Sequence, residues 1–202
     1  KRVDVNKAVT VSGIVLSGID AGNYTLKQPE GLTGTITPRE VTVIGLRAVD
    51  RVYDGGIAVQ LDIAGAGLDD AIAGDDVEPD FTAAAATVAD PNAGTSKAVT
   101  VTGIVLSGID AGNYTLKQPE GLTVTITLAT LVVRPLPASR LTGEPNPEFL
   151  VEYSGFVAGE DASVLAGKAV FTTEATPSSP AGTYPVVVDL AATTLSAANY
   201  AF

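Results

Sequence analysis

Threonine alternates with aliphatic residues in several short stretches of the chain. Because successive side chains of a strand point to opposite faces, this alternation predicts strands with one buried and one solvated face. The clearest examples lie at residues 9–11, 41–43, 99–101 and 122–127. Segments where β-branched and aromatic residues gather between turn residues predict further strands at residues 58–63, 81–88, 149–153, 169–173 and 184–188.

Helical signals are confined to two places. Residues 69–72 and 161–165 each begin with an aspartate that can cap a first turn. We therefore expect an all-β protein of tandem small β-sandwich-like, Ig-like modules arranged end to end, with at most one or two short helical turns.

An internal repeat is the most informative feature of the sequence. Residues 7–37 recur almost unchanged as residues 97–127. Only two positions differ between these copies, and both exchanges suit a strand: Ser12/Thr102 and Gly34/Val124.

A fainter copy lies near the C-terminal end. The loop 91–95 leads through a strand to Asn113–Tyr114, and the loop 179–183 leads in the same order to Asn199–Tyr200. We therefore expect three repeats of one architecture in a segment of a longer protein. The predicted domains are residues 1–38, the C-terminal part of a truncated repeat, residues 39–128, a complete repeat, and residues 129–202, a divergent repeat that lacks its final strand.

Composition and charge narrow the class of protein. Tryptophan, methionine, cysteine and histidine are absent, aromatic residues make up 5%, and the net charge is −11. Such acidity argues against nucleic-acid binding, which needs clustered lysine and arginine. No apolar run approaches the roughly 18 residues of a membrane span, so we expect no membrane insertion. The lack of cysteine gives weak support to export from a bacterium.

Several motifs of residues 39–128 together resemble the YDG repeat of bacterial adhesins. They are Val52–Gly55, Gly74–Val77, Asp90–Thr95 and Leu106–Leu116. The last repeat is similar to the MBG repeat, which often follows YDG units, through Val151–Phe156, Gly159–Asp161, Gly182–Pro185 and Leu195–Phe202. It departs from that pattern at Leu141–Pro147, where an MBG unit usually carries a Tyr-Gly pair before its Asn-Pro.

The resemblance implies a module of a giant, filamentous-haemagglutinin-like surface adhesin. Such a protein is exported from a Gram-negative cell and serves cell contact or biofilm cohesion. The family has no catalytic residues to transfer to this chain.

The residues themselves offer little chemistry for catalysis. The usual general bases and thiol nucleophiles are missing, because the chain has neither histidine nor cysteine. A carboxylate pair for glycoside hydrolysis could come only from Asp75 with Asp76 or Glu78, and such residues are more typical of turn caps. We therefore predict no enzyme, no catalytic or cofactor-binding residues and no cofactor.

An acidic cluster raises the question of calcium, because hard cations favour oxygen ligands from loops. Residues 76–80 have the alternate spacing of an EF-hand, but Phe81 and Thr87 stand where its glycine and bidentate glutamate should be. A solvated acidic turn is the favoured interpretation, no metal site is predicted, and calcium remains an alternative. The cluster comprises Asp69, Asp70, Asp75, Asp76, Glu78 and Asp80.

The Asn-Tyr pairs invite two interpretations. Asn23 and Asn113 match the N-glycosylation pattern, but the pair recurs at Asn199–Tyr200, where Ala201 replaces the threonine. We therefore favour a structural role, in which the tyrosine packs inward and the asparagine holds a turn. For Tyr53 and Tyr153, the aromatic residues most suited to stacking on sugars, core burial is likewise favoured.

These features predict a structural stalk segment of an extracellular adhesin, which spaces a binding region from the cell. The alternative is a weak, multivalent binding module for matrix polysaccharide or sister adhesin fibres. The expected partners are the neighbouring repeats of the same chain, with polysaccharide and sister fibres added under the alternative. A glycan array of one repeat against four repeats separates the two.

Overall fold

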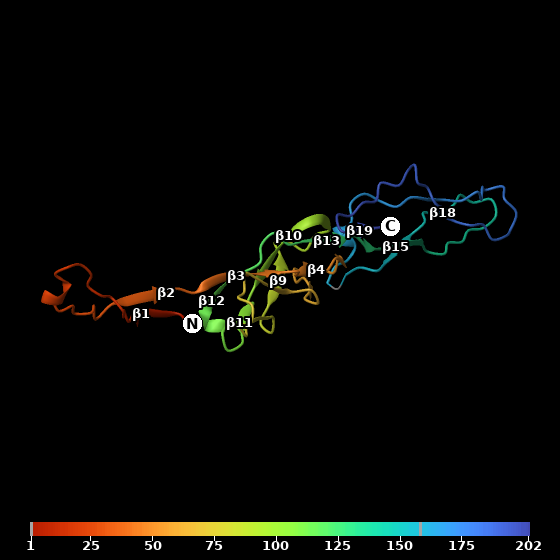
Figure 1. The fold of residues 1–202 in the computed structure, drawn as a ribbon. Helices are drawn as coiled ribbons and strands as arrows, with labels where there is room; N and C mark the ends of the chain where they lie inside the picture. Colours follow the sequence, from red (N-terminus) through yellow and green to blue (C-terminus); the bar gives the residue numbers. More distant parts are fainter. Residues whose placement is uncertain (1, 158) are drawn as a thin grey trace. The chain divides into compact units, whose positions relative to one another are not determined.

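The computed structural model describes residues 2–157 and 159–202 and shows an all-β protein (Figure 1). In the described residues, helical structure is limited to the short 3₁₀ turns η1 (Ala21–Asn23), η2 (Ala111–Asn113) and η3 (Ala162–Val164). This confirms the expected all-β fold class. No helix in these residues is both long and apolar enough to cross a membrane.

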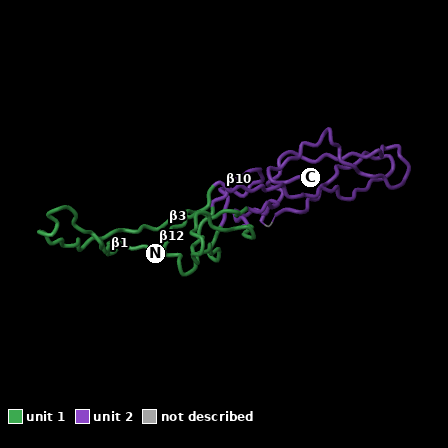
Figure 2. Tube along the Cα trace, in the orientation of Figure 1, with its two compact units in different colours: residues 1–47, 62–85, 101–120 green, residues 48–61, 86–100, 121–202 purple. Residues whose placement is uncertain are grey.

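The chain forms two compact units, each made of separate stretches of sequence (Figure 2). Unit 1 comprises residues 1–47, 62–85 and 101–120, and unit 2 comprises residues 48–61, 86–100 and 121–202. The predicted domain boundaries near residues 38 and 128 therefore fall inside the units, and the division into repeats stays a prediction. The chain passes from one unit to the other within β4 (Arg47–Ala48), β6 (Leu61–Asp62), β9 (Ala85–Val88) and β10 (Gly94–Thr102), and again after Glu120, outside any strand.

Three small sheets make up unit 1. The first pairs β1 (Asp4–Ala8) with β2 (Thr33–Ile36), and another pairs β8 (Glu78–Asp80) with β11 (Val105–Ser107), both antiparallel. The third has the order β12 (Tyr114–Lys117), β3 (Arg39–Ile44), β7 (Gly67–Asp69), with β12 parallel and β7 antiparallel to β3.

Unit 2 contains a four-stranded sheet and three pairs. The sheet has the order β5 (Arg51–Val52), β13 (Thr123–Thr127), β10, β9. The pairs are β14 (Ala129–Thr130) with β19 (Tyr200–Ala201), β15 (Val132–Pro135) with β16 (Val151–Ser154), and β17 (Phe171–Thr172) with β18 (Val187–Val188).

The predicted alternation is visible in the cores. In β3, Val41 and Val43 are buried on either side of half-buried Thr42, and in β13 Val124 and Ile126 are buried in the same way. The other strand predictions hold only in part, because the observed strands are shorter. For example, residues 58–63 contain only the two-residue strand β6.

One strand prediction is wrong for a physical reason. Val99–Val101 lies in β10, whereas the same residues of the first copy, 9–11, follow the end of β1 and form no strand. In unit 1 the second copy pairs with β8 and β3 through β11 (Val105–Ser107) and β12 (Tyr114–Lys117), whereas within the described residues β1 and β2 of the first copy pair only with each other.

One predicted helical turn is present and the other is absent. Asp161 caps η3 by accepting a hydrogen bond from the Ser163 N–H at 2.8 Å. Residues 69–72 form no helix, because Asp69 is the last residue of β7 and Asp70 turns the chain with a left-handed φ of 64°. The unpredicted turn η2 closes through the Ala111 and Asn113 N–H groups, which donate to carbonyls three residues earlier.

Near-identical sequence thus reaches different burial in the two copies. Tyr24 is 72% exposed and Tyr114 only 7%, while Ile14 is 45% exposed and Ile104 only 2%. We expect nitration to modify Tyr24 at least about tenfold faster than Tyr114, because a buried ring reacts only when its surroundings open. Tryptic peptides separate the two tyrosines by mass, since the copies differ at Ser12/Thr102. Equal rates would contradict the burial of Tyr114.

Candidate functional site

The tyrosine of each complete Asn-Tyr pair ties its own repeat together. In unit 1 the Tyr114 hydroxyl accepts a hydrogen bond from the Ile72 N–H at 3.1 Å and donates to the Asp75 carboxylate at 2.7 Å. β12 places this tyrosine opposite Arg39, at the start of the repeat's first strand. One ring therefore connects the beginning, the middle and the end of residues 39–128.

The last repeat has the same arrangement. The Tyr200 hydroxyl accepts from the Val157 N–H at 2.8 Å and donates to the Glu160 carboxylate, while β19 places Tyr200 opposite Ala129. In both repeats the carboxylate stands three residues after the N–H donor. The glycine-acid pairs Gly74–Asp75 and Gly159–Glu160 thus occupy equivalent positions in the two repeats.

The asparagine of each pair reaches into the preceding repeat. In unit 2 the Asn199 side-chain carbonyl accepts from the Ala93 N–H at 3.0 Å, and its amide donates to the Asn92 side chain at 3.0 Å. In unit 1 the Asn113 side chain accepts from the Val3 N–H at 3.0 Å. Val3 and Ala93 are equivalent, because Asp4 and Gly94 pair with Ile36 and Ile126 in the same register.

Both junctions therefore use the same contact, in which a backbone N–H of one repeat donates to the side-chain oxygen of an asparagine in the next repeat. Both donors precede a β-bulge, at which Asn6 and Ser96 have left-handed φ angles of 59° and 52°. The structure is repeated here although the sequences of residues 1–6 and 91–96 share no identity.

The YDG motif lies at the junction in unit 2. The Tyr53 hydroxyl donates to Glu160 Oε1 at 2.5 Å, so one carboxylate binds a tyrosine from each repeat. The rings of Tyr53 and Tyr200 meet edge to face at 5.8 Å between centroids, and Phe156 packs on Tyr200 in the same manner. At Gly55 an added Cβ would come within 3.3 Å of Val157, which favours glycine there.

Local contacts hold the loops that carry this site. Arg51 binds the Asp54 carboxylate and the Gly56 carbonyl, and Asp54 also accepts from the Gly56 N–H. Asp90 accepts from the Asn92 N–H at 3.0 Å and from Lys97 Nζ at 2.7 Å, and this ammonium is the first cause that lowers the pKa of Asp90.

Burial and charge act on both tyrosines. The hydrogen bond to Glu160 is the main cause that raises the pKa of Tyr53, followed by burial. For Tyr200, burial is the main cause that raises the pKa, followed by the hydrogen bond to Glu160. A tyrosinate beside this carboxylate would place two negative charges in a largely buried position, so the site requires neutral tyrosines.

The raised pKa values predict alkaline weakening of the junction. The folded state retains these protons above the ordinary tyrosine pKa of 10.0, so stability is complete below about pH 10 and decreases as the pH rises beyond it. We expect the urea midpoint of unfolding to decrease between about pH 8 and about pH 10.5. Tyr53→Phe should make this decrease smaller, and Tyr24→Phe, at an exposed position, should leave it unchanged. An equal effect of both variants would refute the shared-carboxylate arrangement.

The acidic cluster is spread over separate turns. Asp70 pairs with Arg39 at 3.1 Å, Asp76 accepts from the Ile109 N–H, and Asp80 accepts from the Thr82 N–H and hydroxyl. The Thr82 hydroxyl is the first cause that lowers the pKa of Asp80. No group of three acidic side chains suited to a metal ion occurs within residues 2–157 and 159–202.

The predicted inward packing of the tyrosine holds for two of the three Asn-Tyr pairs and is wrong for Tyr24, which is 72% exposed, while the predicted role of the asparagine was incomplete. Tyr114 and Tyr200 are buried as predicted, and Tyr53 is 6% exposed. The contact of Asn113 and Asn199 with the preceding repeat was missed, as was Glu160. The recurrence of a glycine-acid pair, Gly74–Asp75 and Gly159–Glu160, was the available signal for this contact.

Fold and junction together define a protein of tandem β repeats in direct contact. Comparison with known families agrees: the YDG domain matches residues 37–121, and the MBG domain (YGX type) matches residues 131–202. The chain therefore contains a YDG domain followed by an MBG domain, as in a repeat-type, adhesin-like surface protein. No curated protein and no solved structure matches the chain.

Proposed function

We propose that this chain is a structural stalk segment of a giant extracellular bacterial adhesin. It spaces a binding region from the cell surface, supports cell-cell or biofilm adhesion and acts without catalysis. Its partners are the neighbouring repeats of its own chain.

The recurring junction is the observation that carries this proposal. Val3 with Asn113 and Ala93 with Asn199 make the same contact at successive repeat boundaries. Only Leu128 separates β13 from β14, so no flexible linker lies between the last two repeats. Direct contact transmits force and orientation from one repeat to the next, as a stalk requires.

The acidity of the chain also suits a stalk. A net charge of −11 over 202 residues makes parallel copies repel one another and keeps them soluble. Hydrogen-bonded turn caps such as Asp161 and Asp80 account for part of this charge without any ligand.

A spacer exchange tests the proposal. In cells that produce the adhesin, residues 39–202 are replaced by an unrelated β-repeat array of equal length, and adhesion is compared with that of a deletion. A stalk role predicts that the unrelated spacer preserves adhesion and that the deletion reduces it. If the spacer loses adhesion as fully as the deletion, the segment itself binds and the proposal is wrong.

A further inference from the structure

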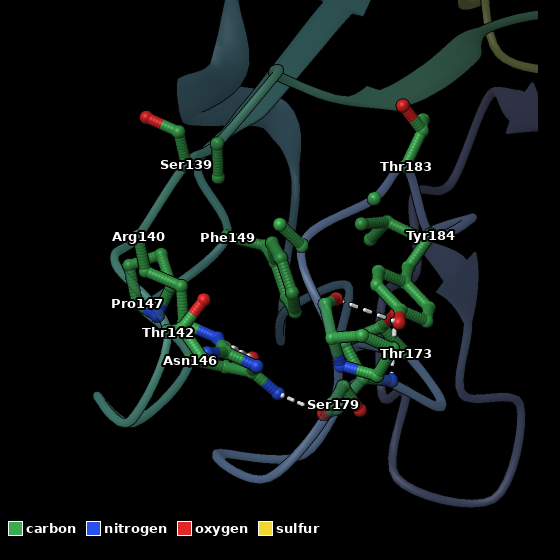
Figure 3. A pocket seen from close by; sticks show the side chains of 16 residues that line it. Ser139, Arg140, Thr142, Asn146, Pro147, Phe149, Thr173, Ser179, Thr183 and Tyr184 are labelled. Carbon is green, nitrogen blue, oxygen red and sulfur yellow. Dashed lines mark hydrogen bonds between the residues drawn. The ribbon is translucent and has the colours of Figure 1, made fainter.

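A cavity of about 480 Å³ opens in the last repeat (Figure 3). In this view Phe149 lies between Arg140 and Tyr184, and the loop that carries Ser179 and Thr183 faces the loop that carries Thr142. Phe149 and Tyr184 are only half-buried, so an apolar surface remains open to an occupant.

The loop that carries Thr142 is equivalent to the YDG loop of the preceding repeat. β3 and β14 hold equivalent positions, because Arg39 pairs with Tyr114 as Ala129 pairs with Tyr200. Further along, Arg51 contacts the Val52 carbonyl and Arg140 contacts the Leu141 carbonyl in the same way. Each arginine then holds its own loop, Arg51 through Asp54 and Arg140 through Asn146.

This equivalence puts Thr142 in the place of Tyr53. At the junction in unit 2, Tyr53 stands two residues after its arginine, fills a buried space and bonds to the next repeat. Thr142 is too short to fill that space, and the cavity is lined by Thr142 together with Phe149. The departure from the Tyr-Gly pattern at Leu141–Pro147 therefore has a structural consequence, which is a hollow.

The loop that carries Ser179 and Thr183 is equivalent to the loop that receives Asn199. Residues 91–95 contain the Ala93 N–H donor, and residues 179–183 place Ala181 in the same position before the shared Gly-Thr. Within residues 2–157 and 159–202, the Ala181 N–H has no hydrogen-bond acceptor. It is the third member of a series in which Val3 and Ala93 already bind an asparagine.

We propose that this cavity is the seat for the Asn-Tyr end of a further β repeat. The asparagine of that repeat accepts from the Ala181 N–H, as Asn199 accepts from Ala93, and an apolar side chain equivalent to Val157 enters the hollow beside Thr142 and Phe149. The proposal goes beyond the stalk function, because it rests on the equivalence of the two loops and not on where the protein works.

The proposed seat at Ala181 differs in a testable respect from the loop at Ala93, which Asn199 occupies. Asn92 supplies a second bond to Asn199, whereas the equivalent residue here is Pro180, whose side chain has no polar atom. One hydrogen bond is therefore available instead of two, and Pro180→Asn is expected to restore the second.

An extended chain tests the seat. Phe202 is equivalent to Leu116, so residues 117–202 are appended directly after Phe202, which supplies a strand like β13 and one further repeat. A Thr183→Ser substitution in the appended copy separates its peptides by mass. We expect amide exchange of residues 179–184 to slow at least about tenfold against the 202-residue chain.

Two variants make the result specific. Replacing the appended counterpart of Asn199 with alanine should abolish most of this protection, and Pro180→Asn should increase it. Resistance of the appended counterpart of Tyr200 to nitration shows that the added repeat has folded. In such a folded chain, unchanged amide exchange of residues 179–184 would overturn the proposal. Protection that survives the alanine variant would overturn it as well.

The other possible occupant is a sugar, because the cavity has the size of a small-molecule site. Cellohexaose and chitohexaose are therefore added at millimolar concentration to the 202-residue chain. If either slows exchange at residues 179–184, the cavity is a carbohydrate site and the repeat-docking proposal is wrong. Unchanged exchange with both sugars is the result expected for a docking seat.

Discussion

Tyr114→Ala is expected to lower the free energy of unfolding of unit 1 by about 3–5 kcal/mol, the range for loss of a buried aromatic ring. The substitution removes a ring that is 7% exposed and leaves the Ile72 N–H and the Asp75 carboxylate without their shared partner. Urea unfolding followed by amide exchange of β12 and β3 measures the loss.

The chain provides its own control for this variant. Tyr24 stands in nearly the same sequence but is 72% exposed, so Tyr24→Ala should change stability by less than about 0.5 kcal/mol. Similar losses for both variants would mean that the Asn-Tyr motif matters through local structure alone and not through its place in a complete repeat.

Gly108→Ala is the second substitution with a large expected effect. Gly108 has φ of 105°, and an added Cβ would stand 2.3 Å from the Asp76 carbonyl oxygen. Strained backbone costs about 1–3 kcal/mol, and displacement of the facing backbone adds roughly 1–3 kcal/mol. The turn at Asp76 must move, which also disturbs its bonds to the Ile109 and Asp110 N–H groups.

Gly18 is the matched control for this prediction. Its φ is 117°, yet no atom lies within 4 Å of the position of an added Cβ. Gly18→Ala should therefore show only the backbone cost, and the difference between the two urea midpoints isolates the close approach to Asp76. A Gly108→Ala variant that is no less stable than Gly18→Ala would refute the observed packing of this turn.

The junction explains why the Asn-Tyr pair recurs in repeats whose other residues diverge. The tyrosine connects three parts of its own repeat, and the asparagine beside it binds the repeat before. Adjacent residues thus serve stability within a module and contact between modules. Gly55 and Tyr53 of the YDG motif serve the same contact from the other side.

Much of the fold could be predicted because period-2 alternation depends only on neighbouring residues. Val41 and Val43, and likewise Val124 and Ile126, are buried as their pattern indicates. Strand ends were predicted less well, since a strand stops where its partner stops. The partners of Tyr53 and Asn199 lie more than one hundred residues away in the sequence. A pattern of neighbouring residues therefore could not predict these contacts.

The sequence by itself determined the all-β class, the near-identical copies 7–37 and 97–127, and the inward packing of Tyr114 and Tyr200, whereas the same prediction is wrong for Tyr24. Only the tertiary structure decided which copy is buried and which residues join the repeats. Residues 7–37 and 97–127 show the reason, because nearly the same sequence leaves Tyr24 exposed and buries Tyr114. Burial depends on strands supplied from elsewhere in the chain: among the described residues, β3 and β8 pair with strands of the second copy, whereas β1 and β2 of the first copy pair with each other.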